Sequence, residues 1–454
     1  MIDQFLRRYH ALLLPLAIFC ILRLIGFACL YTRDSLQVDF AAMYHAGASM
    51  RAGLDPYDNN VDRDPTLWDG VAAFRHSRFL YPPIVAYALQ PISKLSYPLA
   101  KAIWTFASLV TLAACMVIAV QFAGLRLDRA RWLLVIIVTS LLFPLLPFLE
   151  RGQIDSWTLL FISVGFYLIF ARKHDLFGGA VMAVAGFIKL QCFYLLPLLF
   201  IARRPRAAIG MMISIVAISI LQVLLCGPAL SRQYVFEELP RISRHGEVGA
   251  EEMRIDSPVV RQTNSTLPSG DVRASGKWQY RYTLLPDYAA MSSLVPYVRG
   301  VLNAIKLRVP TPLVSVPLLL VALGVAWRIF RHGVADNDAW GRLALMHACL
   351  IIVLLTAPIT WTTNLVWLAP LAILMLFAPE LTDARRATAA AVVGYFLLLI
   401  PDAIACDFLI PRLIDPATNK RFGELLGAHY VIAMLLLLPY TLLLARRSRE
   451  APPI

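Results

Sequence analysis

Long apolar runs separated by short basic links constrain this chain more than any other feature. One run covers residues 98–122, and several runs exceed the ~18 apolar residues that a helix needs to cross a bilayer. The 454 residues are 59% hydrophobic and 16% charged, whereas soluble domains are near half apolar and a quarter charged. A soluble fold has too little interior for these side chains. The sequence therefore predicts an all-α polytopic membrane protein.

The basic residues indicate orientation rather than binding to nucleic acid. The formal net charge is +13, but the basic residues gather in the short links between apolar runs. These clusters are Arg126/Arg129/Arg131, Arg172/Lys173, Arg203/Arg204/Arg206, Arg328/Arg331/Arg342, Arg385/Arg386 and Arg446/Arg447/Arg449. Such links are typical of cytoplasmic loops. The surplus of positive charge also predicts contact with anionic headgroups of membrane lipids.

Alternating the sides of the membrane gives about ten full spans with both termini cytoplasmic. The expected spans are 11–30, 98–122, 132–149, 154–171, 207–226, 311–329, 340–357, 364–378, 387–404 and 428–445. Two long polar segments, 31–97 and 227–309, are then extracytoplasmic loops. We expect a multi-pass protein of the cell membrane, the inner membrane in a bacterium with two.

The stretch 176–201 does not fit this alternation as a simple span. Basic pairs lie at both ends, Arg172/Lys173 and Arg203/Arg204, so both ends should be cytoplasmic. Its ~26 residues cannot cross twice, because one crossing needs ~20. A helical hairpin that turns near Lys189-Leu190-Gln191 fits, provided that it is buried or lines a wet cavity. The alternative is one full span with a compensating error elsewhere in the topology.

Two ionisable residues are candidates for chemistry. Asp39 follows the first span, where a carboxylate on the water–lipid boundary could act as a base on a lipid-linked substrate; the alternative is a solvated loop aspartate. Lys189 interrupts an apolar stretch, where an ionisable side chain is costly and indicates function. A lysine that reaches for the interface, or a structural ion pair, is the alternative there.

No cofactor is indicated. The seven cysteines form no CxxC pair, and no spacing of His and Asp argues for a bound metal ion. The chain also lacks a nucleotide-binding motif.

Several short motifs follow one another along the chain. They are Asp39-Phe40 with Tyr44, Gly53-Leu54-Asp55-Pro56-Tyr57, Tyr81-Pro82-Pro83, Gly152-Gln153, Gly186-Phe187-Ile188-Lys189, Asn264-Ser265-Thr266 and Pro358-Ile359-Thr360-Trp361. With these motifs, roughly residues 30–370 resemble bacterial glycosyltransferase family 87, whose members are multispanning enzymes of the GT-C type. Two departures stand out: the family usually carries a His or two where this chain reads Thr362-Thr363-Asn364, and Asn-Gln-Ser where it reads Asn264-Ser265-Thr266.

The resemblance implies a single GT-C-like transmembrane domain over 1–454. Its donor would be a polyprenyl-phosphate sugar, commonly mannose, and its acceptor a lipid or cell-envelope glycan at an extracytoplasmic active site. Asp39 would be the general base of an inverting single displacement. The leaving lipid phosphate needs stabilisation by cations or hydrogen-bond donors, for which the candidates are Lys189, Arg151 and Arg281. The candidates for binding sugar or acceptor are Tyr44, Asp55, Tyr57, Tyr81, Gln153, Asn264 and Trp361.

Two other functions are weighed against this one. A transporter or flippase of lipid-linked sugars would carry ionisable residues in the middle of several spans and paired broken helices in two halves, but only one broken segment stands out. A structural assembly factor would leave Asp39 and Lys189 unexplained.

Overall fold

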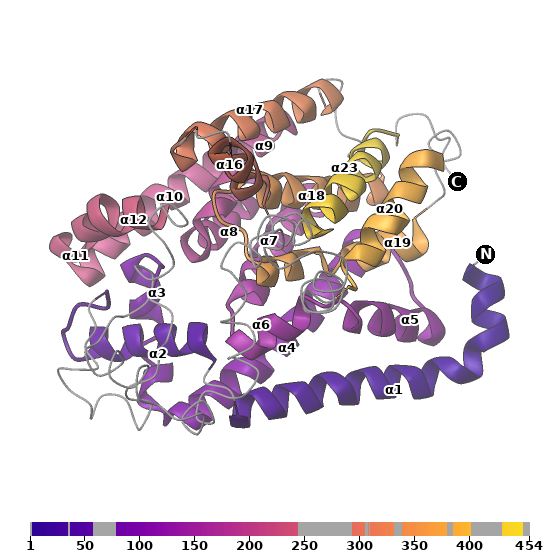
Figure 1. Cartoon of the computed structure of the whole chain (residues 1–454), viewed down its shortest axis with the longest axis horizontal. Coiled ribbons are helices and arrows are strands. Elements are labelled where there is room, and N and C mark those ends of the chain that lie inside the picture. The colour runs from indigo at the N-terminus through magenta and orange to yellow at the C-terminus, as the bar shows by residue number, and fades with distance from the viewer. Residues whose placement is uncertain are drawn as a thin grey trace.

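In the computed structural model, helix α18 (Ala339–Thr356) lies at the centre of a helical bundle (Figure 1). Its apolar stretch is 83% buried, whereas those of α10 (Pro205–Cys226) and α17 (Thr311–Phe330) are 17% and 22% buried. The outer helices therefore present large apolar side chains such as Leu224 outward. Broad exposed apolar surfaces mark contact with a membrane, so α10 and α17 face lipid and α18 is the core.

The structure describes residues 2–34, 37–57, 79–243, 293–304, 307, 309–330, 338–378, 385–400 and 429–447. Every regular element within these ranges is a helix.

Six helices are long and apolar enough to cross a bilayer, counted over the described ranges. They are α10, α17 and α18 together with α1 (Ile2–Asp34), α4 (Tyr97–Phe122) and α23 (His429–Arg447). A bent pair, α5 (Arg129–Ser140) and α6 (Leu145–Arg151), gives a seventh. The chain is thus a multi-pass membrane protein.

The expected total of ten full spans is not reached among the described residues, because three expected spans contain only shorter helices. These are α7 (Asp155–Phe166) with the π-helical turn η4 (Tyr167–Ala171), η8 (Thr362–Leu368) with α19 (Leu371–Phe377), and α20 (Arg385–Leu397). Hydropathy reports how apolar a stretch is. It does not report where the helix within that stretch breaks.

The expected span 132–149 is bent by 64° between α5 and α6. Pro144 has no backbone N–H, so it cannot donate to the carbonyl of Ser140 four residues earlier, as a continuous helix would require. The guanidinium of Arg23, from the apolar part of α1, donates to that carbonyl oxygen at 3.0 Å instead. The bend turns α6 away from the axis of α5 and sets the direction in which the following turn points.

A second break lies inside the stretch for which the sequence predicts a hairpin. Helix α8 (Asp175–Ile188) ends at Lys189, whose backbone is extended, and the short helices η5 (Leu190–Tyr194) and α9 (Leu195–Ile201) follow. Asp175 pairs with Arg204 at 3.6 Å, so α8 and α10 begin side by side. At the other ends, Lys189 lies against Tyr81, and Gln222 of α10 contacts the backbone of Ile84. The two helices therefore run parallel, and residues 190–201 lead back to the end where α8 began.

The first polar segment, 31–97, was expected to be a loop, but helices occupy much of its described part. Helix α1 continues to Asp34, and α2 (Val38–Arg51), α3 (Pro83–Ala88) and the short η3 (Ile92–Lys94) follow. Asp39 thus lies in the first turn of a helix rather than in a solvated loop. The second segment, 227–309, likewise contains α11 (Pro228–Gln233), η6 (Tyr234–Glu238), α12 (Leu239–Ser243) and α16 (Leu294–Ala304). Figure 1 shows α2, α3, α11 and α12 gathered at one end of the molecule.

Close packing of α8 on α10 generates a prediction about stability. A Cβ at Gly210 would overlap the backbone carbonyl of Leu176, so the two helices would have to separate. We expect Gly210→Ala to lower the free energy of unfolding by about 1–3 kcal/mol, which is typical of overpacking. Thermal unfolding of the protein purified in detergent measures this loss.

The matched control is Gly324→Ala in α17, where a Cβ would meet nothing within 4 Å. That change should be neutral or should stabilise the helix by up to about 1 kcal/mol, because alanine is the better helix former. Equal unfolding temperatures for the two variants would contradict the close approach of α8 and α10.

Candidate active site

The turn between α6 and α7 presents the central side chains of the site. Helix α6 ends at Arg151, and Gly152 follows in the left-handed region at φ 66°. The backbone N–H groups of Gly152 and Gln153 donate back to Leu149 and Phe148 at 3.2 and 3.1 Å. This is the usual way in which a glycine closes a helix. These two backbone hydrogen bonds hold the turn in one conformation. They therefore fix the directions in which the side chains of Arg151 and Gln153 leave the backbone.

Helix α2 packs directly on this turn. The amide of Gln37 donates to the Leu149 carbonyl at 3.1 Å, and the indole of Trp104 donates to the Gly152 carbonyl at 2.9 Å. The bond from Trp104 satisfies the carbonyl of Gly152, which lies past the end of α6, and the bond from Gln37 is a second one to the Leu149 carbonyl, beside that of the Gly152 N–H. A Cβ on Gly152 would lie 2.7 Å from the Cβ of Phe40. Glycine is therefore required for α2 to come this close.

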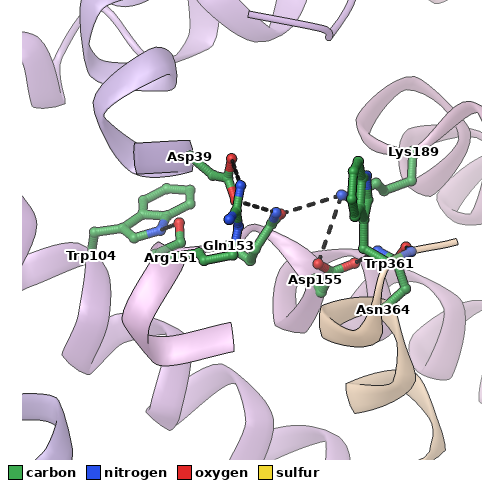
Figure 2. Close-up of polar contacts among 9 residues, drawn as sticks. Asp39, Trp104, Arg151, Gln153, Asp155, Lys189, Trp361 and Asn364 are labelled. Atoms are coloured by element: carbon green, nitrogen blue, oxygen red, sulfur yellow. Dashed lines mark hydrogen bonds and ion pairs between the residues drawn. The ribbon is translucent and has the colours of Figure 1, made fainter. Parts of the chain in front are cut away.

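The carboxylate of Asp39 is held by two neighbours from that turn (Figure 2). Arg151 donates from Nε to Oδ2 at 2.5 Å and from Nη2 to Oδ1 at 3.0 Å, which is a two-pronged contact. Gln153 donates from Nε2 to Oδ2 at 2.6 Å. Asp39 is 8% exposed. The arrangement suits a carboxylate, which only accepts hydrogen bonds, at the start of a helix, where negative charge is favoured.

Lys189 joins this group from the break after α8. Its ammonium donates to Oε1 of Gln153 at 3.3 Å and lies 3.7 Å from Oδ2 of Asp155. The other carboxylate oxygen of Asp155 accepts from Nδ2 of Asn364 at 2.6 Å. A continuous polar network thus runs from Arg151 through Asp39, Gln153, Lys189 and Asp155 to Asn364 (Figure 2).

Tyr81 lies at the edge of this network. The Lys189 ammonium is 5.6 Å from the centre of its ring. Desolvation raises the pKa of the Tyr81 phenol to about 12, although the positive charge of Lys189 lowers it. The phenol is therefore neutral at physiological pH and can donate as well as accept a hydrogen bond.

A family model described as Glycosyltransferase family 87 matches residues 79–358, which is more than half of the chain. The chain belongs to glycosyltransferase family 87. It is accordingly a membrane glycosyltransferase. No protein of curated function and no solved structure matches it.

The family match covers only part of the network. Arg151, Gln153, Asp155 and Lys189 lie within it, but it begins after Asp39 and ends before Asn364. Membership in family 87 therefore identifies the class of enzyme but assigns no role to these side chains.

Not every candidate of this family 87 protein joins the network. Tyr44 is buried and its hydroxyl donates to the Leu95 carbonyl at 2.8 Å, so it holds α2 to the next segment. Asp55 accepts from Gln233 of α11 at 2.7 Å, and the Tyr57 hydroxyl donates to the Tyr81 carbonyl at 2.6 Å. Tyr57 therefore supports the segment that carries Tyr81, and Asp55 links the turn before Tyr57 to α11.

The remaining candidates differ in what the structure says of them. The backbone N–H of Trp361 donates to the side chain of Asn364 at 2.7 Å, which places Trp361 next to the end of the network. Arg281 and Asn264 lie outside the described residues.

Sequence reasoning missed Asp155 and Asn364. Asp155 begins the expected span 154–171, so the rule that singled out Lys189, an ionisable residue in an apolar stretch, could have found it. Asn364 belongs to the stretch Thr362-Thr363-Asn364 that departs from the family pattern, but no local signal indicates its pairing with Asp155, which is 209 residues away in sequence.

The contact between Gly152 and α2 generates a prediction for this glycosyltransferase. Alanine at Gly152 costs about 1–2 kcal/mol for its left-handed backbone, and its Cβ would also collide with Phe40 and Gln37. Gly53 has a similar φ of 71° but open space around it, so Gly53→Ala carries the backbone cost alone.

We expect Gly152→Ala to lose about 1–3 kcal/mol more stability than Gly53→Ala, which corresponds to the added overpacking. Thermal unfolding of both variants beside the wild type tests this difference. Equal losses would show that α2 does not rest on the turn.

Proposed function

We propose that this enzyme transfers a monosaccharide, with mannose the first to test, from a polyprenyl phosphate to a hydroxyl group of a lipid or cell-envelope glycan. The reaction takes place on the extracytoplasmic face by a single displacement with inversion. One observation carries the proposal: Gln153 bridges the carboxylate of Asp39 and the ammonium of Lys189. A base and a cation for a leaving phosphate thereby lie together among the membrane helices.

Asp39 is the proposed general base. Its Oδ2 already accepts from Arg151 and Gln153, while Oδ1 accepts from Arg151 and has a further lone pair for the acceptor hydroxyl. As the hydroxyl oxygen forms its bond to the anomeric carbon, its proton moves to the Asp39 carboxylate. The bond from that carbon to the phosphate oxygen breaks, and the lipid phosphate leaves with the electron pair. Attack and departure on opposite faces invert the anomeric carbon.

Lys189 is the proposed partner of the leaving phosphate. Charge that develops on a leaving group is best stabilised by donors that are already in position. An ammonium has three N–H donors, and the Tyr81 phenol beside it can add another. Arg151 uses two of its five N–H groups on Asp39, so we assign it to orienting the base. Arg281 stays a candidate for the phosphate.

The position of the network along α8 supports a donor that is delivered by the membrane. Helix α8 begins beside the basic cluster at Arg204, which the distribution of charge assigns to the cytoplasmic side. Its 14 residues extend about 21 Å, whereas the hydrocarbon core is about 30 Å thick. Lys189 would then lie toward the outer face but below its surface, within reach of a lipid-linked phosphate. This assignment keeps both termini cytoplasmic.

The aromatic candidates frame the proposed sugar site. Tyr81 and Trp361 are partly exposed, and such rings can stack on a sugar or an isoprenoid chain. Because its side-chain amide is already engaged by Asp39 and Lys189, we assign Gln153 to linking these two groups rather than to a sugar hydroxyl.

The other candidates hold neighbouring segments in place. Tyr44 fixes α2, which carries Asp39. Tyr57 fixes the segment that carries Tyr81, whereas Asp55 links the turn before Tyr57 to α11.

Replacing the proposed base gives the direct test. Asp39→Asn preserves size but cannot take up the proton, so transfer should fall by about 10²–10⁴-fold, the usual contribution of a general base. Membranes with equal amounts of wild type and variant are incubated with radiolabelled polyprenyl-phosphate mannose, and label in new glycolipid or glycan is counted.

The control for this test is Asp128→Asn. Asp128 is an exposed residue that caps the start of α5, and asparagine caps helices equally well, so transfer should be unchanged. Equal transfer by wild type and Asp39→Asn would refute the role of Asp39 while leaving the class of enzyme intact. Wild-type protein that moved the labelled lipid across the bilayer without forming product would favour the flippase.

A further inference from the structure

We infer that Asp155, oriented by Asn364, is a positioning residue that holds the Lys189 ammonium in place and so sets the affinity for the phosphate of the donor. The inference rests on the proposed function, because it takes Lys189 as the group that contacts this phosphate. Neither Asp155 nor Asn364 was a candidate from the sequence.

Asp155 is placed to act through Lys189 rather than on the substrate. Its side chain is fully buried, with 0% exposed, whereas that of Asp39 is 10% exposed. Its two carboxylate oxygens face Lys189 and Asn364. A carboxylate enclosed in this way cannot reach an acceptor hydroxyl, so its effect must pass through its neighbours.

The orientation of Asn364 is fixed from its other side. Its Oδ1 accepts from the backbone N–H of Trp361 at 2.7 Å, so this atom must be the oxygen. Its Nδ2 then points at Asp155, to which it donates at 2.6 Å. The arrangement leaves no ambiguity between the oxygen and nitrogen of the amide. Asp155 is also the first residue of α7, where the N-terminal end of the helix favours a negative charge.

Lys189 needs such a partner because its side chain is long and flexible. A buried ammonium must be paired or hydrogen-bonded, and a lysine without a fixed counter-charge can swing toward another acceptor. The nearby contacts from Gln153 and Tyr81 are neutral. Asp155 supplies the negative charge that keeps the ammonium beside Gln153. If Lys189 moved, the phosphate would lose its cation, while Asp39 would keep its contacts with Arg151.

If Asp155 acts only by positioning Lys189, its replacement should affect KM for the donor more than kcat. Asp155→Asn should raise KM for polyprenyl-phosphate mannose about tenfold, the factor expected if the displaced ammonium loses one hydrogen bond to the phosphate, with a smaller change in kcat. Lys189→Gln should raise KM at least as much. The double variant should be no worse than Lys189→Gln alone, because residues that act as one unit are not additive.

Asp175→Asn is the matched control. It removes a comparable ion pair, Asp175 with Arg204 at 3.6 Å. This pair lies at the start of α8, whereas Lys189 lies at the end of α8. It should cost stability without changing KM for the donor. Additive effects of Asp155→Asn and Lys189→Gln on KM would overturn the inference. So would an unchanged KM in Asp155→Asn, or an equal rise of KM in Asp175→Asn.

A binding measurement separates this inference from the proposed function. If the wild type transfers sugar from no polyprenyl-phosphate donor, the proposed function fails. The thermal stabilisation given by polyprenyl phosphate alone then decides the inference. Stabilisation of the wild type and Asp175→Asn, but not of Asp155→Asn or Lys189→Gln, supports it. Equal stabilisation of all four proteins, or none of the wild type, overturns it.

Discussion

The cost of burying charge among membrane helices governs this structure. A charged side chain away from water is tolerated only when a partner and further hydrogen bonds compensate for its lost hydration. The network meets this condition by alternating signs: Arg151 with Asp39, and Lys189 with Asp155. Gln153 links the two pairs, because its amide donates to Asp39 and its oxygen accepts from Lys189. Removing one member of either pair would leave the charge of its partner poorly compensated.

The irregular parts of the backbone follow from the same condition. Three departures from regular helix lie at the network: the left-handed Gly152, the extended Lys189, and Trp361, where extended backbone precedes η8. Backbone that leaves a helix within a membrane exposes polar groups, and this is tolerated only where protein or water satisfies them. Each departure delivers a side chain that a continuous helix would have pointed elsewhere. The breaks and the charges therefore depend on one another.

The sequence predicts what depends on local composition and leaves out what depends on pairing. The expected spans 98–122 and 207–226 agree closely with α4 and α10, because a long apolar run is sufficient to define a lipid-crossing helix. The break at Lys189 follows from basic residues at both ends of one short stretch. In contrast, Asp39 and Arg151 are 112 residues apart in sequence, and no local pattern indicates that they meet. The helical character of the segment around Asp39 was also missed, because turn-forming residues further along suggested a loop.

Charge conservation during the proposed transfer explains why such a closed network can still host a reaction. Its four charged side chains sum to zero, and a sugar phosphodiester donor adds one negative charge. When the sugar leaves, the lipid phosphate gains one negative charge while Asp39 gains a proton from the acceptor hydroxyl. The total is therefore the same before and after transfer, and charge only moves from Asp39 toward the phosphate. Gln153 lies between the proposed start and end of that movement, with its amide on Asp39 and its oxygen on Lys189. A fixed dipole in this position requires little reorganisation during the reaction, which is the property that preorganised electrostatic stabilisation depends on.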